Sequence, residues 1–371
     1  MKSIVYFSLV NWKWIKQRPH FIPFYLFKNG YNINYIYIKS LGLELLKNKS
    51  LVKNRIDEDT FNINSLVQLP FSSRFETIRK LNNSILKKQF FNIYRNQNPD
   101  IIIFTHPNQI DNTEEKLINK SKIIYECMDN MVAFLKDEKK RNIILKNELK
   151  LCNKADKIIV SSKKLKEVLN KRYDISLNKI QIIYNAFDLD SLSSNDNNSE
   201  INMNKNLTYI GTISEWIDFD ILYNFARENK SFNILMVGPI DNKAMKIINK
   251  KPDLNNIHYY GSVEHKEIPK YIINSDVMLI PFKRNPLINC VDPVKAYEYL
   301  FFKKPVVSSY WSEMDKFSSY VYFYNNNQEF DSSVKKAMDN GLKSHSKLEE
   351  FLNNSTWEKR IEDYIEIIEG I

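Results

Sequence analysis

Cysteine and glycine are scarce in this sequence of 371 residues, and their scarcity excludes several classes of protein. Cys127, Cys152 and Cys290 are an odd number and show no C-x-x-C spacing, which argues against a disulfide framework or a structural zinc site and favours a reducing cytoplasm. The seven glycines form neither G-x-G-x-x-G nor G-x-x-x-x-G-K-[ST], so the sequence has no dinucleotide fingerprint and no P-loop. A G-x-S-x-G elbow, typical of serine hydrolases, is also missing.

Long apolar runs are missing as well. None approaches the roughly 18 residues that a membrane-spanning helix needs. Residues 1–14 have too short an apolar region and no small-residue cleavage site for a signal peptide, so we expect neither a membrane span nor export. The hydrophobic share of 43% and the charged share of 26% are typical of a globular protein, and the length predicts two domains.

Positive charge is concentrated in the first half of the chain. Residues 1–185 carry 33 Lys and Arg against 17 Asp and Glu, whereas residues 186–371 carry 21 against 27. A basic half can face an anionic membrane or a polyanion, or it can be only a solvated lysine-rich surface.

Residues 74–95 predict a basic amphipathic helix. Their helical spacing places one set of apolar residues on one face and most of the basic ones elsewhere. The helix could lie on anionic lipid, or it could pack on the sheet of its own domain with a solvated outer face. The apolar set is Phe75, Ile78, Leu81, Ile85 and Ile93.

Short β-branched or aromatic runs alternate with amphipathic stretches along both halves, which predicts an α/β fold with parallel sheets. A polar segment rich in Ser and Asn separates the halves. Because open α/β sheets bind ligands at the carboxyl ends of their strands, we expect a binding cleft between two such domains. The expected parts are a Rossmann-like domain 1–187, a linker 188–206, a second Rossmann-like domain 207–354 and a closing helix 355–371, for which a return to the first domain is one option.

The strongest local signal is the segment 291–308, VDPVKAYEYLFFKKPVVS. Asp292 can cap a helix whose first position suits Pro293, and Lys295 and Glu298 then share one face. The amides and the positive end of the helix, with Lys295, would favour a diphosphate, and Glu298 could accept bonds from ribose hydroxyls. The alternative is a capped helix with a simple ion pair. Near the end of the chain, Ser355 stands three residues before a Glu and predicts a second cap.

This segment resembles the P-x-K-x-x-E-Y-L-A-x-G-K-P-V-V block of GT-B glycosyltransferases of the group 1 type, related to family 4. Other motifs are similar to the nucleotide-sugar domain of that family and occur in the same order: YIGTISEWIDFD at 209–220, MVGP at 236–239, YGSVEHKEIP at 260–269, DVMLIPF at 276–282 and WEKR at 357–360. In the first half, WIKQRPH at 14–20 and YECMDN at 125–130 are similar to the acceptor domain of capsule and teichuronic-acid members.

The resemblance implies a GT-B fold, with two Rossmann-like domains facing each other across a cleft. It also implies a hexosyltransferase that moves a sugar from a nucleotide diphosphate sugar, with UDP as the expected nucleotide. The acceptor would be lipid-linked or a surface polysaccharide of the capsule, lipopolysaccharide or teichuronic type. The nucleotide sugar is a substrate, and neither a metal nor a resident cofactor is implied.

Carried over residue by residue, the resemblance assigns the diphosphate to Lys295 and the ribose to Glu298. A loop at 261–265 would meet the edge of the base, and Gly211 would let the backbone approach the phosphates closely. The remaining donor-site residues implied in this way are Gly238, Ser262, Val263, His265, Arg284 and Val294.

Two departures from the family pattern bear on the mechanism. Cys290 stands where many members have the first carboxylate of an E-x7-E pair. The loop after Gly211 holds Glu215 and Asp218 in place of the usual phosphate-binding cations, for which Lys283 and Arg284 offer a substitute. The donor sugar and the stereochemical course therefore stay open.

An inverting transfer needs a general base for the acceptor hydroxyl. Asp129, at the end of a predicted strand, is the first candidate, and Glu126 is a competing carboxylate; a strand-end or capping acid is the alternative for each. His106 follows another strand and is a third candidate; the alternative is that it has a structural role. Arg18 and His20 are predicted to bind anionic groups of the acceptor, against a plain turn.

Two other functions stay open at this stage. One is a sugar-nucleotide epimerase of GT-B fold, which would turn over UDP-N-acetylglucosamine without an acceptor. The other is a basic nucleic-acid-binding protein, whose surface would interleave aromatic and basic side chains. The aromatic residues of the basic half fall mainly at strand or core positions, so we expect no nucleic-acid partner. We expect a cytoplasmic enzyme with peripheral association at the inner face of the cell membrane.

Overall fold

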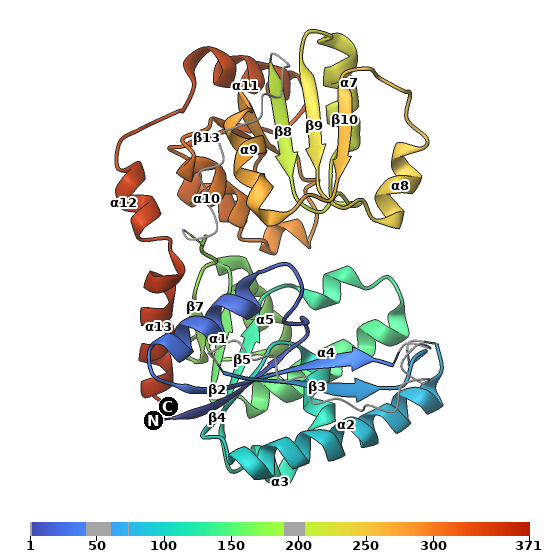
Figure 1. Ribbon diagram of the computed structural model, residues 1–371, viewed down its shortest axis with the longest axis vertical. Helices are drawn as coiled ribbons and strands as arrows, with labels where there is room; N and C mark the ends of the chain where they lie inside the picture. Colours follow the sequence, from blue (N-terminus) through green and yellow to red (C-terminus); the bar gives the residue numbers. More distant parts are fainter. Residues whose placement is uncertain (1, 42–60, 73, 189–204) are drawn as a thin grey trace. The chain divides into compact units, whose positions relative to one another are not determined.

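The computed structural model describes residues 2–41, 61–72, 74–188 and 205–371, and the named strands in this part of the chain form two parallel sheets (Figure 1). The chain divides into two compact units. Unit 1 is Met1–Tyr184 with Arg360–Ile371, and unit 2 is Asn185–Lys359. Two parallel sheets with alternating helices confirm the predicted α/β class. Most of the predicted linker, residues 189–204, lies outside the described residues.

Unit 1 contains a seven-stranded sheet in the order β3-β2-β1-β4-β5-β6-β7. Its central strands are almost wholly buried, which fits their continuous apolar sequences. The strands are β1 (Ser3–Ser8), β2 (Asn32–Ser40), β3 (Asn62–Gln68), β4 (Ile101–Phe104), β5 (Lys122–Cys127), β6 (Lys157–Val160) and β7 (Ile180–Ile182). The helices are α1 (Arg18–Lys28), α2 (Glu76–Gln97), α3 (Glu115–Ile118), α4 (Glu138–Lys154), α5 (Lys163–Tyr173) and α13 (Trp357–Glu369), whose first turn starts in unit 2.

Unit 2 contains a six-stranded sheet in the order β10-β9-β8-β11-β12-β13 around one apolar core. Its strands are β8 (Asn206–Ile210), β9 (Asn233–Val237), β10 (Ile257–Gly261), β11 (Val277–Ile280), β12 (Val306–Ser309) and β13 (Val321–Tyr324). Its helices are α7 (Phe219–Glu228), α8 (Asn242–Ile248), α9 (Ile268–Ile273), α10 (Val294–Phe301), α11 (Asn327–Asn340) and α12 (Leu348–Asn353).

Helix α2 confirms the helix predicted over 74–95, but its buried stripe is not the apolar set identified from the sequence. The buried stripe runs through Asn82, Leu86, Phe90 and Tyr94. Asn82 is buried because its amide donates to the carbonyl of Leu69 at 2.9 Å and its oxygen accepts from the amide nitrogen of Leu69 at 2.8 Å. A polar residue thus occupies a core position. Of the apolar set identified from the sequence, Phe75 is 48% and Leu81 51% exposed, whereas Ile78, Ile85 and Ile93 are half-buried.

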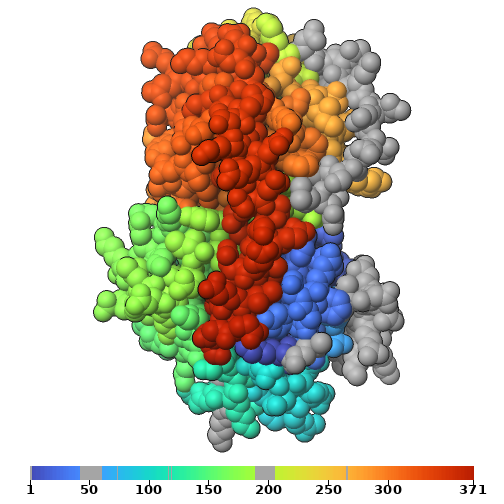
Figure 2. Space-filling view, turned by 90° about the vertical axis from the view of Figure 1, so that its left-hand side faces the viewer, coloured from blue at the N-terminus to red at the C-terminus, as the bar shows by residue number. Residues whose placement is uncertain are grey.

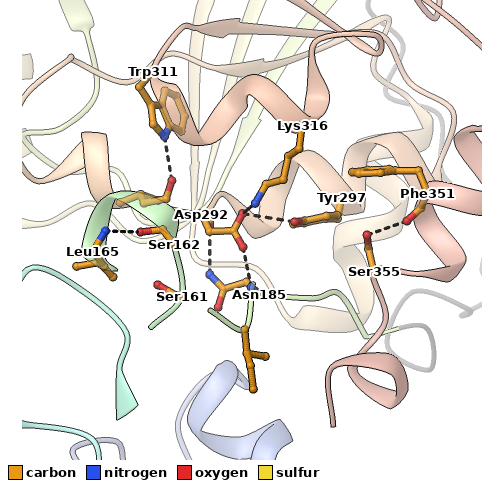
Figure 3. A network of polar contacts seen from close by, with 12 residues as sticks. Ser161, Ser162, Leu165, Asn185, Asp292, Tyr297, Trp311, Lys316, Phe351 and Ser355 are labelled. Carbon is orange, nitrogen blue, oxygen red and sulfur yellow. Dashed lines mark hydrogen bonds and ion pairs between the residues drawn. The ribbon is translucent and has the colours of Figure 1, made fainter. Parts of the chain in front are cut away.

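The closing helix α13 packs on unit 1 next to the start of the chain, and the two chain ends lie together in Figure 1. Figure 2 shows this red helix beside the blue N-terminal segment. Lys2 donates to the carbonyl of Ile368 at 2.8 Å and pairs with Glu369 at 3.1 Å. The predicted cap on Ser355 is wrong, because its hydroxyl donates back to the carbonyl of Phe351 at 2.7 Å (Figure 3).

Candidate functional site

Three glycines end three neighbouring strands of unit 2. Gly211 follows β8 with φ of +138°, Gly238 follows β9 with φ of +135°, and Gly261 ends β10 with φ of +69°. The Gly211 amide donates to the carbonyl of Val237 at 2.8 Å, and the Gly238 amide donates to the carbonyl of Gly261 at 2.7 Å. A Cβ atom on Gly238 would lie 2.2 Å from the carbonyl oxygen of Gly211, so no side chain fits there. This edge of the sheet is therefore lined by bare backbone.

Lys295, the second residue of α10, lies against this backbone. A Cβ atom on Gly211 would approach Cε of Lys295 to 2.4 Å and its Nζ to 2.6 Å. The Nζ atom also stands 5.8 Å from the centre of the Tyr209 ring. Burial lowers the pKa of Lys295, and Glu298, one turn further along α10, opposes this shift. The structure thus brings three predicted donor-site residues together: Gly211, Gly238 and Lys295.

Helix α10 is fixed to the end of β8 by Tyr299. Its buried hydroxyl accepts a hydrogen bond from the amide of Ile210 at 3.0 Å and donates to the carbonyl of the same residue at 3.3 Å. Tyr299 holds Lys295 in position by joining helix and strand. The sequence did not predict this role, because a tyrosine within an apolar helix cannot be distinguished from any other buried core residue.

Asp292 does not cap α10, contrary to the sequence expectation. Pro293 occupies the cap position, and no side chain of the described residues caps the helix. The carboxylate of Asp292 is buried; it accepts a hydrogen bond from the amide of Asn185 at 2.6 Å and forms an ion pair with Lys316 at 2.6 Å, as Figure 3 shows. A buried carboxylate needs a cation and donors around it, and these come from residues distant in the sequence. In the first turn of α10, the amide of Ala296 donates to the carbonyl of Pro293 at 3.1 Å, and no side chain of the described residues caps the amides of Val294 and Lys295.

The other predicted donor-site residues lie in three places. Ser262 is exposed and Val263 half-buried, both directly after β10. His265 begins a short 3-10 turn, and its side chain is outside the description. Val294 is the first residue of α10 and is half-buried. Arg284 is exposed and donates to the side chain of Asn325 at 3.1 Å, so its contacts lead to the start of α11 rather than to Lys295.

The loop after Gly211 supplies acids whose partners are structural. Glu215 pairs with Lys243 of α8, and Asp218 caps α7 by accepting from the amide of Ile221 at 3.3 Å. Asp220, in the first turn of α7, pairs with Lys251. Across the described ranges, no group of three His, Cys, Asp or Glu residues is arranged to hold a metal ion.

In unit 1, Arg18 and Glu126 are paired with each other and are both buried. The Nε atom of Arg18 lies 2.7 Å from Glu126, and its Nη1 atom donates to the carbonyl of Ile183 at 2.8 Å. The other oxygen of Glu126 accepts from the hydroxyls of Tyr6 at 2.5 Å and of Tyr364, on α13, at 3.3 Å. These contacts make the pair a structural link between the sheet, α1 and the closing helix. The roles predicted for the two residues stay predictions.

Asp129 lies two residues after the end of β5, and the residue is half-buried. Burial raises the pKa of Asp129, and the nearby Arg18 partly offsets the rise. A carboxyl with a raised pKa is better matched to proton transfer near neutral pH than an ordinary one.

Both histidines predicted for the site have structural bonds. His106 caps a 3-10 turn by accepting from the amide of Asn108 at 3.2 Å, and burial lowers its pKa to about 4. The imidazole of His20 accepts from the amide of Gln17 at 3.2 Å through Nδ1, and its Nε2 lies 3.2 Å from the carbonyl of Asn11. Burial also lowers the pKa of His20. Both rings are therefore neutral near pH 7, and neutral rings suit these bonds.

Comparison with solved structures identifies the architecture. Sucrose-phosphate synthase from Thermosynechococcus elongatus matches all of this chain and 99% of its own, with a TM-score of 0.77 and 12% identity. The chain has the GT-B fold. HepE of Anabaena, solved in complex with UDP, matches all of both chains with a TM-score of 0.70 and 12% identity. The lipopolysaccharide outer core galactosyltransferase WaaB matches with a TM-score of 0.65 and 13% identity over all of this chain and 99% of its own.

Sequence comparison finds two relatives of this GT-B protein. TuaH of Bacillus subtilis, named as a teichuronic acid biosynthesis glycosyltransferase, is 27% identical over 220 residues, which are 56% of this chain and 55% of TuaH. An uncharacterised 41.2 kDa protein from the cps region of Klebsiella pneumoniae is 29% identical over 179 residues, 45% of this chain and 48% of that protein. The match thus spans about half the length of each relative. It confirms the resemblance to this group of proteins. No protein-family model matches the chain.

Among the described residues, none of the helices has both the length and the apolar content for a membrane span.

Proposed function

We propose that this protein is a glycosyltransferase that moves a sugar from a UDP-sugar to a lipid-linked or surface-polysaccharide acceptor. One observation carries the proposal: Lys295, at the start of α10, lies against the bare backbone of Gly211. A cation, free helix amides and close backbone approach are the groups that bind a diphosphate. The UDP complex of HepE and the names of TuaH and WaaB supply the nucleotide and the kind of acceptor by analogy.

In this proposal the chain lowers the barrier by stabilising the leaving diphosphate. Lys295 and the amides at the start of α10 neutralise the negative charge that develops on the leaving group as the sugar departs. Glu298 orients the nucleotide by accepting bonds from the ribose hydroxyls. Because Cys290 is buried and its thiol contacts the carbonyl of Pro286 at 3.5 Å, it does not replace the missing carboxylate of the E-x7-E pair.

If the transfer inverts the anomeric configuration, Asp129 removes the proton from the acceptor hydroxyl. The raised pKa of Asp129 makes it a stronger base than an ordinary aspartate. Glu126 is less suited to this task, since both of its oxygens already accept hydrogen bonds.

The test begins with a thermal-shift screen over nucleotides and nucleotide sugars, because a tight ligand raises the melting temperature by mass action. The nucleotide that binds is then supplied as its sugar conjugate, with and without lipid-linked or polysaccharide acceptors. Release of the nucleoside diphosphate only when an acceptor is present supports a transferase. Turnover without any acceptor would point to the epimerase, and failure of all nucleotides to bind would remove the proposal.

We further propose that unit 1 associates with anionic membrane surfaces through the outward face of α2. Phe75 and Leu81 are about half exposed there, next to basic residues including Arg79 and Lys80. Apolar side chains among cations are typical of interfacial helices. We also propose that the transferred sugar is a hexose and that the protein acts at the inner face of the cell membrane.

Vesicle sedimentation tests this surface. Binding to phosphatidylglycerol vesicles should exceed binding to phosphatidylcholine vesicles and weaken as added salt shortens the Debye length. Replacing Phe75 and Leu81 by Ser should reduce binding, whereas the control Leu149→Ser, at an exposed leucine of α4, should not. Equal binding to both lipids, or loss of binding in the control alone, would refute the assignment.

A further inference from the structure

A second candidate site lies in unit 2, at the carboxyl ends of β11, β12 and β13. It is a pocket of about 480 Å³ whose lining residues all belong to this unit. Ser309 and Tyr324, the last residues of β12 and β13, form part of its wall, and the first turn of α11 closes one side. The volume is in the range of small-ligand sites.

Hydrogen-bond donors and acceptors are balanced around this pocket. Asp218 contributes a carboxylate and Arg284 a guanidinium, so their formal charges cancel. The four consecutive residues 325–328 each carry a side-chain amide, which both donates and accepts; those of Asn325 and Asn326 already donate to Glu329 at 2.9 and 2.8 Å. An oxyanion only accepts hydrogen bonds, whereas a sugar hydroxyl does both. This lining therefore suits a neutral ligand with many hydroxyl groups.

Tyr324 gives an independent indication of a ligand. Its side chain is buried against the pocket, and its hydroxyl has no hydrogen-bond partner among the described residues. Burial and the nearby Asp218 raise the pKa of Tyr324, so its hydroxyl keeps its proton and remains a donor. The neighbouring Ser309 hydroxyl donates to the carbonyl of Phe282 at 2.7 Å, and its proximity to Tyr324 partly offsets the rise in the Tyr324 pKa. Buried polar groups are rarely left unbonded, and a bound hydroxyl would satisfy this one.

The pocket is separate from the predicted diphosphate site but linked to it. Phe282 lines the pocket and packs edge-on against Tyr209, with the ring centres 6.1 Å apart. The Nζ atom of Lys295 stands 5.8 Å from the centre of the same Tyr209 ring. Arg284 belongs to the pocket, since its guanidinium donates to Asn325.

We propose that this pocket binds a neutral hexose unit of a saccharide through its hydroxyl groups. Arg284, Asp218 and the amides of the α11 start contact the hydroxyls, and the Phe282 ring offers an apolar surface to the sugar carbons. The proposal concerns a saccharide site distinct from the nucleotide site, and it holds whether or not UDP binds at Lys295.

Saturation-transfer NMR with glucose and galactose tests the proposal on the full chain. Tyr324→Phe should weaken hexose binding by about threefold, the effect of losing one neutral hydrogen bond. Arg284→Gln should weaken it by roughly tenfold, as expected for a charge-assisted bond. Tyr322→Phe, which removes a hydroxyl from the same strand outside the pocket, and Lys283→Gln are the matched controls and should leave binding unchanged.

Parallel titrations separate this proposal from the proposed donor site. Lys295→Ala should lose affinity for UDP and keep affinity for the hexose. The proposal is overturned if neither hexose binds, or if binding is the same in Tyr324→Phe and Arg284→Gln as in the wild type. It is also overturned if inorganic phosphate or glucuronate binds at Arg284 while neutral hexoses do not. Loss of hexose binding in Lys295→Ala alone would place the sugar at the nucleotide site instead.

Discussion

Replacing Lys295 with Met should weaken the binding of UDP while making the ligand-free protein more stable. Methionine keeps most of the length of the side chain and removes its charge. In the native protein the lysine is packed against the backbone of Gly211 and the ring of Tyr209. The variant therefore changes the electrostatics of the site with little change in volume.

The size of the binding effect follows from the kind of contact. A hydrogen bond to a charged group contributes about 1.5–3 kcal/mol, and each 1.4 kcal/mol is a tenfold change in affinity, so UDP should bind roughly 10- to 150-fold more weakly. Glu298→Ala should have a similar effect through the ribose. The control Lys336→Ala, at an exposed lysine of α11, should bind UDP like the wild type.

Lys295→Met should stabilise the ligand-free protein although it weakens UDP binding. The reason is that burial lowers the pKa of Lys295 below its usual 10.5, so the charged lysine destabilises the native state. Between the lowered value and 10.5 the unfolded chain binds more protons than the native one, so the free energy of unfolding should rise with pH across this window. Lys295→Met should abolish this rise and should increase the melting temperature near neutral pH.

Calorimetry with UDP and thermal unfolding from pH 7 to 10.5 measure both effects. Unchanged UDP affinity in folded Lys295→Met and Glu298→Ala would refute the diphosphate assignment. A melting temperature lower than that of the wild type would show that the ammonium is compensated in the native state and that the reasoning from burial is mistaken.

Three further changes test other parts of the structure. Gly238→Ala should lower the free energy of unfolding by at least about 2 kcal/mol in urea titrations, because its Cβ would meet the carbonyl oxygen of Gly211 and φ is +135°; wild-type stability would contradict the close approach. Arg18→Met should cost about 3–5 kcal/mol by leaving the Glu126 carboxylate buried without its cation, and adding Glu126→Gln should recover most of the loss; no recovery would mean that the two residues do not act as a pair. Asp129→Asn should lower turnover roughly 100-fold with UDP affinity intact, unless product analysis by NMR shows retention of configuration.

Local patterns in the sequence predicted the most regular parts of the structure. The apolar runs at the centre of each sheet became strands because their β-branched and aromatic residues are buried on both faces, as in β4 and β11. Strand β3 was not identified, since its sequence NINSLVQ mixes polar and apolar residues without a clear alternation. It lies at the edge of its sheet, where one side of the strand has no neighbouring strand to impose an apolar pattern.

The common face of Lys295 and Glu298 could be predicted from the sequence, because residues three positions apart in a helix lie on the same side of it. The partners of Asp292 were not readable in this way. Asn185 and Lys316 approach it from distant parts of unit 2, so the carboxylate binds them instead of capping α10. The same holds for Glu126, whose partners Arg18 and Tyr364 come from opposite ends of the chain.

The sequence by itself therefore determined the α/β class, the order of most elements and the helix face that carries the candidate diphosphate site. These depend on periodicity and on contacts within a few residues. Only the tertiary structure decided which polar side chains are bonded to each other, which face of α2 is buried, and that Arg284 and Tyr324 share a pocket. These depend on the packing of segments far apart in the chain, and the hydrogen bonds of a buried group are set by the neighbours that packing brings to it.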